Sequence, residues 1–159
     1  MKINMSFDNK DLILDNYTNI DPLALPNDKF GRINCHPDNL NLIVNDGQAE
    51  EIIANMVLNY ISHKKLYSVL KTWSNKLSHN GTLEIFYIDL IEVARLIITG
   101  QIKEQNAIQL IYGSQKEEWD FFKSSISIYE LKMFFENEGL IIESVGKKEH
   151  LSKIKVRRR

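Results

Sequence analysis

The chain has 159 residues, of which 43% are hydrophobic and 26% are charged, and its formal net charge is -1. A chain of this length and apolar content can bury one proper core, so we expect a single domain over residues 1–159. The charge balance excludes a general electrostatic attraction to nucleic acid or to an anionic membrane, so such binding would need a local patch.

Short strands separated by loop signals are predicted in the first third of the chain. Alternating or β-forming residues predict strands over residues 2–7, 17–20, 32–35 and 50–55. Only about a dozen residues separate the first two strands, which is too few for a crossover helix with its turns. The first crossover must therefore be shortened to a loop or a short turn.

A helix and a strand are predicted to follow. Apolar residues recur at helical spacing between Leu66 and Leu77, and the helix is predicted to stop at residues 78–81, where Gly81 fits a left-handed cap. The β-forming residues 82–87 come directly after. The order strand, helix, strand predicts a right-handed parallel crossover.

The last part of the chain predicts two helices and a hairpin. One helix is expected through residues 91–96 and another over Ile128–Asn137, and both should cover faces of the sheet. Residues 140–145 and 152–156, joined by a polar link over residues 146–150, predict a terminal antiparallel pair.

Several segments, in this order, resemble the class I S-adenosylmethionine-dependent methyltransferases. Residues 73–85 resemble that family's helix end, Pro-Gly-Gly-like turn and fifth strand, with Gly81 retained. Residues 87–90 resemble its Pro-Asp-Leu segment, and residues 110–115 resemble a Tyr-Gly-x-Gln segment of one subset. The resemblance implies an α/β, Rossmann-like fold with a mostly parallel seven-stranded sheet that ends in a β-hairpin.

The resemblance also implies a cofactor, S-adenosylmethionine or its product S-adenosylhomocysteine, outside the first, second and fourth strands. Ser6 and Asp8 stand where the subset has glycines, and Asp21 ends the second strand, where an acid would accept both ribose hydroxyls. Asp38 would face the adenine amino group, and Asn55 would reach the cofactor or the methyl acceptor. Asp21, Asp38 and Asn55 also have a plain interpretation as turn or capping residues.

Candidate residues for catalysis and acceptor binding are fewer. Asp89, at the carboxyl end of the fifth strand, could bind substrate or act as a base, although its position as a helix N-cap explains it fully. Tyr112, Gly113, Ser114 and Gln115 could form an acceptor-side lid or end a helix. Methyl transfer needs no catalytic triad, because the sulfonium methyl is already activated.

Aromatic and basic residues near the end of the chain have two interpretations each. Trp119 and Phe122, with Phe121 between them, could line an acceptor pocket, but such spacing favours anchoring on the core. The basic residues from Lys153 to Arg159 could contact RNA. Their alternation with apolar residues favours instead the solvent face of a strand and a frayed tail, so we expect no nucleic-acid binding.

Other site classes find little support. Cys35 is the only cysteine, which excludes an internal disulfide and a multi-thiolate metal site, and the four histidines lack metal-ligand spacing, so we predict no metal. The N-terminus turns polar before a signal-peptide core could form, and no apolar run approaches the roughly 18 residues of a membrane span. We therefore expect a cytoplasmic protein without membrane contact.

Two functions remain open at this point. One is an S-adenosylmethionine-dependent methyltransferase whose acceptor is unknown; the other is a catalytically inactive methyltransferase-like binding or structural module. Ser6 and Asp8 favour the second, because glycine lets the backbone approach the methionine part of the cofactor. So do Asn59 and Tyr60, which replace the family's Glu-His. A nucleotide- or sugar-binding protein of other chemistry is disfavoured, because no glycine cluster follows a strand. A sheet edge covered by a second copy would give a homodimer.

Overall fold

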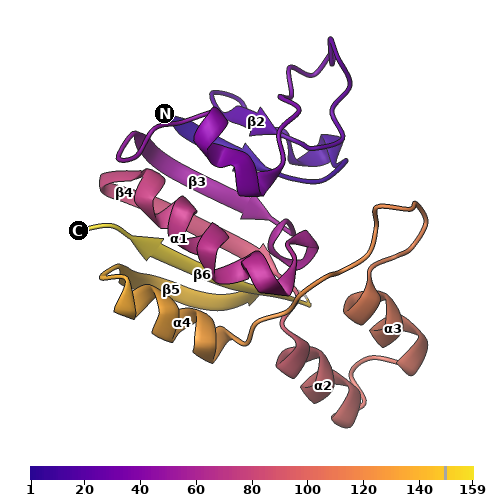
Figure 1. Cartoon of the computed structure of the whole chain (residues 1–159). Coiled ribbons are helices and arrows are strands. Elements are labelled where there is room, and N and C mark those ends of the chain that lie inside the picture. Colours follow the sequence, from indigo (N-terminus) through magenta and orange to yellow (C-terminus); the bar gives the residue numbers. More distant parts are fainter. Residues whose placement is uncertain (149) are drawn as a thin grey trace.

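The computed structural model describes residues 1–148 and 150–159 and shows one six-stranded mixed sheet in the order β2-β1-β3-β4-β6-β5 (Figure 1). Strands β2, β1, β3 and β4 pair in parallel, whereas β6 is antiparallel to both β4 and β5. The strands are β1 (Lys2–Met5), β2 (Thr18–Ile20), β3 (Ala49–Asn55), β4 (Leu77–Tyr87), β5 (Ile141–Lys148) and β6 (Leu151–Arg157).

The terminal antiparallel pair is confirmed, but the predicted strand over residues 32–35 is not. In the described part of the chain this segment forms only an isolated parallel bridge, between Ile20 and Ile33. Two backbone hydrogen bonds hold the bridge, and the chain then turns into a 3-10 helix, η2 (Pro37–Leu42). The expected seventh strand is thus reduced to a single point of pairing. Glu149, in the predicted hairpin link, lies outside the described residues.

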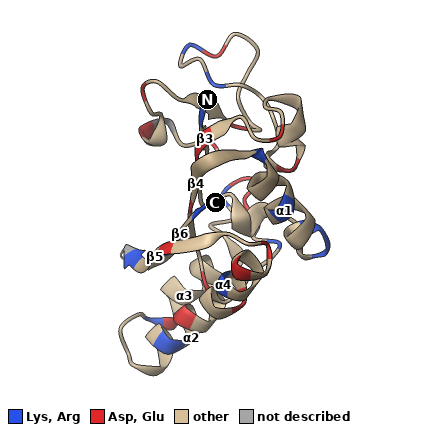
Figure 2. Ribbon diagram, turned by 90° about the vertical axis from the view of Figure 1, so that its left-hand side faces the viewer, with Lys and Arg blue, Asp and Glu red and all other residues tan. Residues whose placement is uncertain are grey.

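The described residues form four α-helices: α1 (Leu66–Lys76), α2 (Leu90–Ile98), α3 (Glu104–Tyr112) and α4 (Ile128–Asn137). Figures 1 and 2 show α1 and α4 on the same side of the sheet. Trp73 of α1 is fully buried there, and its Nε1 donates to the carbonyl oxygen of Pro37 at 2.9 Å. Leu131 and Phe135 of α4 are likewise fully buried in the main core.

The expectation that the helix after Asp89 covers the sheet is wrong. Helix α2 packs instead against α3, which the sequence did not predict. Val93 and Ala107 from these helices form a small separate core with Ile88. This pair lies below the right-hand ends of the strands in Figure 1, so it extends the molecule beyond the sheet and leaves the sheet face to α1 and α4.

The opposite face of the sheet carries none of the four α-helices (Figure 2). The first crossover is a loop with one 3-10 turn, η1 (Lys10–Leu12), as the short spacing predicted. Side-chain amides attach this loop to the sheet: Asn4 Nδ2 donates to Leu12 O at 2.6 Å and to Asn19 Oδ1 at 2.8 Å, and Asn55 Nδ2 donates to Asn4 Oδ1 at 2.9 Å. An asparagine network therefore takes the place of a packed crossover helix.

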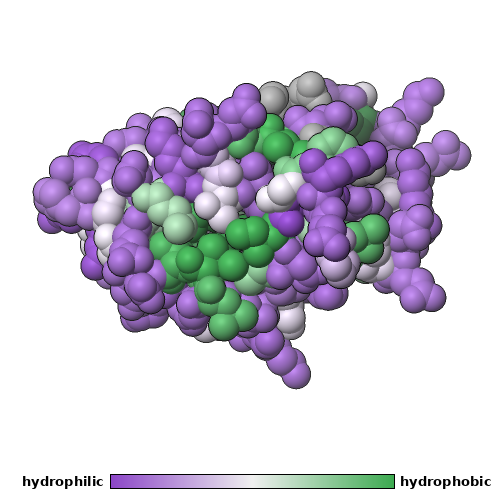
Figure 3. All heavy atoms as spheres, turned by 90° about the horizontal axis from the view of Figure 1, so that it is seen from above, coloured by the Kyte–Doolittle hydropathy of each residue, from purple (hydrophilic) through white to green (hydrophobic). Residues whose placement is uncertain are grey.

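Ion pairs cross the remainder of that face. Glu84 accepts from Lys153 at 2.6 Å, and Glu143 accepts from Arg157 Nε at 2.8 Å. Parallel sheets usually have both faces covered, so a charged open face beside a parallel region is unusual. At the β2 edge, hydrophobic residues gather on the surface seen from above (Figure 3), and the segment from 22 to 42 exposes Leu25 and Leu42.

The junction between α1 and β4 differs from the prediction. The helix ends at Lys76 and β4 begins at Leu77, so Gly81 lies inside the strand, and Asn80 has the positive φ of 61°. Gly81 is needed for close approach, because an added Cβ would lie 2.6 Å from Ala49 O. The expected left-handed glycine cap is therefore wrong, since the chain passes directly from helix to a bulged strand.

Replacing Asn4 with alanine is expected to destabilise the fold. Asn4 is almost fully buried, and its loss would leave Leu12 O and the Asn55 amide without this partner and would remove one of two donors to Asn19 Oδ1, which costs about 2 kcal/mol. Denaturant unfolding measures the change. The exposed Asn106→Ala on α3 is the control, and equal midpoints for the two variants would contradict the role of the network.

Gly81→Ala should lower the free energy of unfolding by about 1–3 kcal/mol, because the methyl group would clash with backbone atoms that cannot move aside alone. Gly146→Ala is the matched control in another strand. An added Cβ there meets nothing within 4 Å, so the effect should stay within about 0.5 kcal/mol. A thermal shift of the same size in both variants would disprove the close-approach explanation.

Candidate functional site

The strand order places a crevice between β1 and β3. The chain leaves β1 for β2 on one side and returns as β3 on the other, and ligands of open α/β sheets bind outside the carboxyl ends at such a reversal. Ser6 follows β1, Asn55 ends β3 and Asp21 follows β2. The fold thus brings three of the predicted cofactor residues to one edge.

Aromatic rings occupy this crevice. Phe7, just after β1, stacks on Tyr60 from the loop after β3, with centroids 4.5 Å apart and planes 30° apart. Trp119 stacks on the same Phe7 ring at 6.1 Å, and Phe122 meets Tyr60 edge-on at 5.1 Å. Three segments far apart in the sequence therefore meet at the carboxyl ends of β1 and β3. Phe121, the third predicted anchor, is 45% exposed.

A buried carboxylate fixes these rings in place. Tyr60 Oη donates to Asp120 Oδ1 at 2.6 Å, and the Ser114 hydroxyl donates to Asp120 Oδ2. Burial, followed by the hydrogen bond to Asp120, raises the pKa of the Tyr60 hydroxyl, so this group stays protonated. Gly113 ends α3 with φ of 86°, and a Cβ there would lie 2.5 Å from Asp120 O.

The predicted lid residues are thus partly fixed. Ser114 is bound through its side chain, and the Gln115 amide donates to Asp120 O at 3.2 Å. Tyr112 is half exposed at the end of α3, and Gly113 supplies the turn. Through these contacts, the segment packs against one side of the aromatic cluster.

Asp21 is fully buried and already paired. Its Oδ2 accepts from Arg32 Nη1 at 2.6 Å, and its Oδ1 accepts from the Leu23 amide at 2.9 Å. Arg32 also binds Asp28 at 2.9 Å, and these hydrogen bonds hold the pKa of Asp28 at about 2. Each oxygen could accept a second hydrogen bond, but Asp21 is fully buried, so ribose hydroxyls could reach it only if the surrounding loop moved.

The other loop residues near β1 contribute little to a cofactor cradle. Ser6 is buried, whereas Asp8 is exposed with φ of 42°, a conformation that favours glycine. The pKa of Arg32 is raised mainly by the hydrogen bonds that it donates to Asp28, and the charge of Asp8 adds to this effect. The negative side chain therefore faces the Asp21–Arg32 region.

A cavity of about 370 Å³ remains open beside the aromatic cluster. Asp38 lies in it, 2.5 Å from His36 Nδ1 and 3.2 Å from Lys65 Nζ. Burial opposes the ionisation of Asp38, but the hydrogen bonds from Lys65 and His36 outweigh it and lower its pKa. The cavity is lined by His36, Asp38, Asn39, Tyr60, Ile61, Ser62, Lys65 and Lys123.

Sequence reasoning missed most of this lining. Tyr60 was noted only as a replacement in the segment that resembles the family's Glu-His, and His36, Lys65 and Lys123 carried no binding motif. One local signal was present, since His36 stands two residues before Asp38 and that spacing allows a side-chain contact.

Asp89 acts as a cap for two helices. Its Oδ1 accepts from the amides of Ile91 and Glu92 at the start of α2, and its Oδ2 accepts from the Ile128 amide at the start of α4, at 2.8 Å. Nearby, Asn59 exchanges hydrogen bonds with the backbone of Ile88 at 2.8 and 2.9 Å. Both buried side chains are fully engaged with backbone groups.

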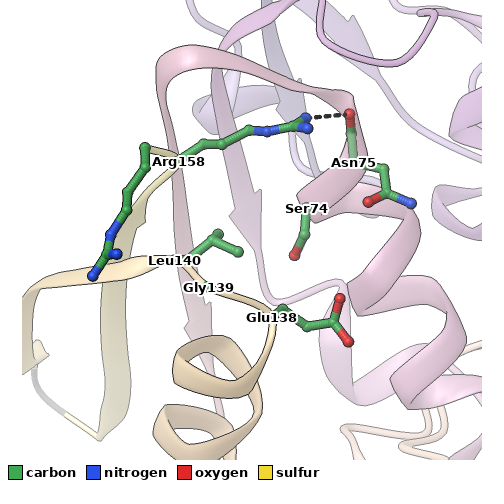
Figure 4. A pocket seen from close by; sticks show the side chains of 7 residues that line it. Ser74, Asn75, Glu138, Gly139, Leu140 and Arg158 are labelled. Carbon is green, nitrogen blue, oxygen red and sulfur yellow. Dashed lines mark hydrogen bonds between the residues drawn. The ribbon is translucent and has the colours of Figure 1, made fainter.

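A smaller cavity, of about 180 Å³, lies at the opposite edge, where α1 and α4 end (Figure 4). Arg158 Nη1 donates there to the carbonyl oxygens of Asn75 at 2.9 Å and Leu77 at 2.7 Å. A cation at the end of a helix satisfies its last carbonyls. This cavity therefore belongs to the capping of α1, and none of the predicted site residues lines it.

Two further properties concern the described residues alone. They contain no group of three or more His, Cys, Asp or Glu side chains placed to hold a metal ion. None of the helices in residues 1–148 and 150–159 combines the length and the hydropathy that crossing a bilayer requires.

A scan against protein-family models and a search of curated proteins gave no match. Solved structures do match. One is the 1,6-didemethyltoxoflavin-N1-methyltransferase of Burkholderia thailandensis, solved with bound 1,6-didemethyltoxoflavin and S-adenosylhomocysteine. It superposes with a TM-score of 0.58 over 89% of this chain, at 10% identity. This chain spans 60% of that enzyme's length.

Two more methyltransferases superpose comparably. One is an S-adenosylmethionine-dependent enzyme of Archaeoglobus fulgidus, with a TM-score of 0.56 and 10% identity over 88% of this chain and 75% of that one. The other is the plantazolicin methyltransferase BamL, with a TM-score of 0.55 and 12% identity over 91% of this chain and 69% of that one. The chain therefore has the fold of the class I S-adenosylmethionine-dependent methyltransferases.

Proposed function

We propose that this chain is a methyltransferase-fold binding module that holds the nucleoside part of S-adenosylmethionine or S-adenosylhomocysteine without transferring a methyl group. The observation that carries the proposal is the stack of Phe7 on Tyr60 in the crevice between β1 and β3. The protein's own rings fill the volume in which a methyl donor would have to meet its acceptor.

The methionine part of the cofactor does not fit these residues. A cradle needs backbone that approaches the ligand closely, but Asp8 stands in a left-handed conformation with a charged side chain. Asp21, the candidate ribose ligand, is fully buried, and its two oxygens accept hydrogen bonds from Arg32 and from the Leu23 amide. Binding the whole cofactor would require the ring stack and a buried ion pair to open together.

The nucleoside part fits better in the cavity at Asp38, beside the aromatic cluster. The cavity at Asp38 lies in the loops after Ile33 and after β3, beside the crevice, and it is large enough for a purine. Tyr60 and Ile61 offer apolar contact, while Asp38, Asn39 and Ser62 offer polar atoms that could read an adenine edge. The S-adenosylhomocysteine bound to the Burkholderia thailandensis enzyme supports this ligand class.

Neither Asp89 nor Tyr60 is free to serve as a base. Asp89 would have to give up the N-termini of two helices, and the Tyr60 hydroxyl is held protonated by burial and by Asp120. Tyr112, Gly113, Ser114 and Gln115 close the aromatic cluster, and we assign them no acceptor. We therefore propose a binding role and not an enzymatic one.

Calorimetric titration tests this function with adenosine, S-adenosylhomocysteine and S-adenosylmethionine. All three should bind with affinities that agree within roughly threefold, because the methionine part adds no favourable contact. Asp38→Asn should weaken all three, whereas the exposed Asp15→Asn should change none. If none of the three ligands binds, the proposed nucleoside-binding role is wrong. Methyl transfer to any acceptor would overturn the proposal that the protein is catalytically inactive.

Removing the Phe7 ring should restore part of the space that the methionine chain of the cofactor would need. In Phe7→Ala, the affinity for S-adenosylhomocysteine relative to adenosine is expected to rise by roughly tenfold, because the methionine chain gains the vacated space. Phe121→Ala is the matched control, since its half-exposed ring lies in the same segment as Trp119 and Phe122. An unchanged affinity ratio in Phe7→Ala would mean that the stack does not occupy the ligand's place.

A further inference from the structure

The outer surface of α4, with its flanks, exposes apolar side chains that the monomer does not cover. Tyr129 is 70% exposed and Ile91 is 66% exposed, and Tyr67, Leu90 and Met133 are about half exposed. We name this the α4 surface. A concentration of large apolar side chains on one face marks an interaction site more often than scattered single residues do.

Two hollows flank α4 on this surface. The first, of about 240 Å³, lies toward α1 and is lined by Tyr67, Glu130, Met133, Phe134 and Asn137. The second, of about 230 Å³, lies toward the start of α2 and is lined by Leu90, Ile91, Ser125, Ser127 and Glu130. Glu130 lines both, so the two hollows adjoin along one ridge. A helical ridge between grooves is the shape that packs against another helix.

Basic residues lie on the α1 side of the groove, and acidic residues lie on α4, which also carries Lys132. Lys64 and Lys71 lie on the α1 side of the groove, and Glu130 and Glu136 lie on α4. Lys71 already reaches across the groove to Glu138, at 3.3 Å. Among the ion pairs of the described residues, none includes Lys64, Glu130 or Glu136. These three groups are thus available to a partner.

The directions of the helices make this charge pattern self-complementary. Strands β4 and β5 are both antiparallel to β6, so α1 and α4, which lead into them, run in the same direction across the sheet (Figure 1). A two-fold axis along the groove keeps that direction, so it would lay α4 of one copy on α1 of the other with matching ends together. Residues near the starts of the two helices would then meet.

We propose that two copies of this chain associate through the α4 surface about such an axis. Lys64 would pair with the partner subunit's Glu130, and by symmetry Glu130 would pair with the partner subunit's Lys64. Tyr129 and Met133 would pack in the centre, where interfaces favour tyrosine and methionine over charged residues. The occupant is a second copy because the same surface supplies both the basic and the acidic half of the contact.

Sedimentation equilibrium over a concentration series tests the association. The full chain should be dimeric, and Tyr129→Glu and Met133→Glu should each raise the dissociation constant by roughly tenfold or more. Leu42→Glu is the control, because Leu42 is 79% exposed at the β2 edge, away from the α4 surface. Circular dichroism checks the folding of each variant, and the highly exposed Tyr129 keeps the test valid if Met133→Glu does not fold.

Charge reversal distinguishes this geometry from other dimers. Lys64→Glu and Glu130→Lys should each weaken the dimer, and the double variant should restore it, because the pair is re-formed with opposite sign. A monomeric wild type at every soluble concentration would overturn the proposal. So would a dimer that dissociates in Leu42→Glu but not in Tyr129→Glu, or a double variant weaker than both single ones.

Discussion

The short connection between β1 and β2 constrains the rest of this molecule. Residues 6–17 cannot hold a helix with its turns, so one face of a parallel sheet has no helix to cover β1 and β2. Buried amides are satisfied instead by one another, through Asn4, Asn19 and Asn55. A polar network can fill this place only when each member has a partner, so the loop that carries Leu12 is fixed to the sheet.

The short connection between β1 and β2 also shapes the edge at the carboxyl ends of β1 and β3. Without a glycine turn leading into a helix, the chain after β1 brings Phe7 back over the crevice, where it meets Tyr60 and Trp119. Asp120 then ties this cluster to the segment after α3 through Tyr60 and Ser114. An aromatic cluster therefore fills this edge, and the hollow at Asp38 adjoins it.

Loss of helices on one face also concentrates the packing on the other. Helices α1 and α4 cover the main core together with η2, whereas α2 and α3 form a small pair beyond the strands. The outer surface of α4 is therefore flanked by α1 on one side and by the start of α2 on the other, with apolar side chains between them. The charged open face, by contrast, satisfies its own residues through Glu84 and Glu143.

Local patterns in the sequence determined the elements that depend on neighbours along the chain. The helix over Ile128–Asn137, the Asp89 cap, the shortened crossover and the terminal hairpin all rest on spacing, capping or chain length, which a single sequence carries. The family resemblance gave the fold, because the order of these elements survives when individual motif residues change.

Tertiary structure alone decided the features that join distant segments. No local signal pairs Asp21 with Arg32 or Phe7 with Tyr60, because each contact depends on which strands lie side by side. Residues 32–35 have strand propensity yet form one bridge, since propensity does not supply a partner edge. Gly81 is fixed by the nearby carbonyl of Ala49, and not by the helix that precedes it. The sequence thus determined the elements that depend on local spacing and capping, and long-range packing decided which segments pair and which side chains fill the crevice between β1 and β3.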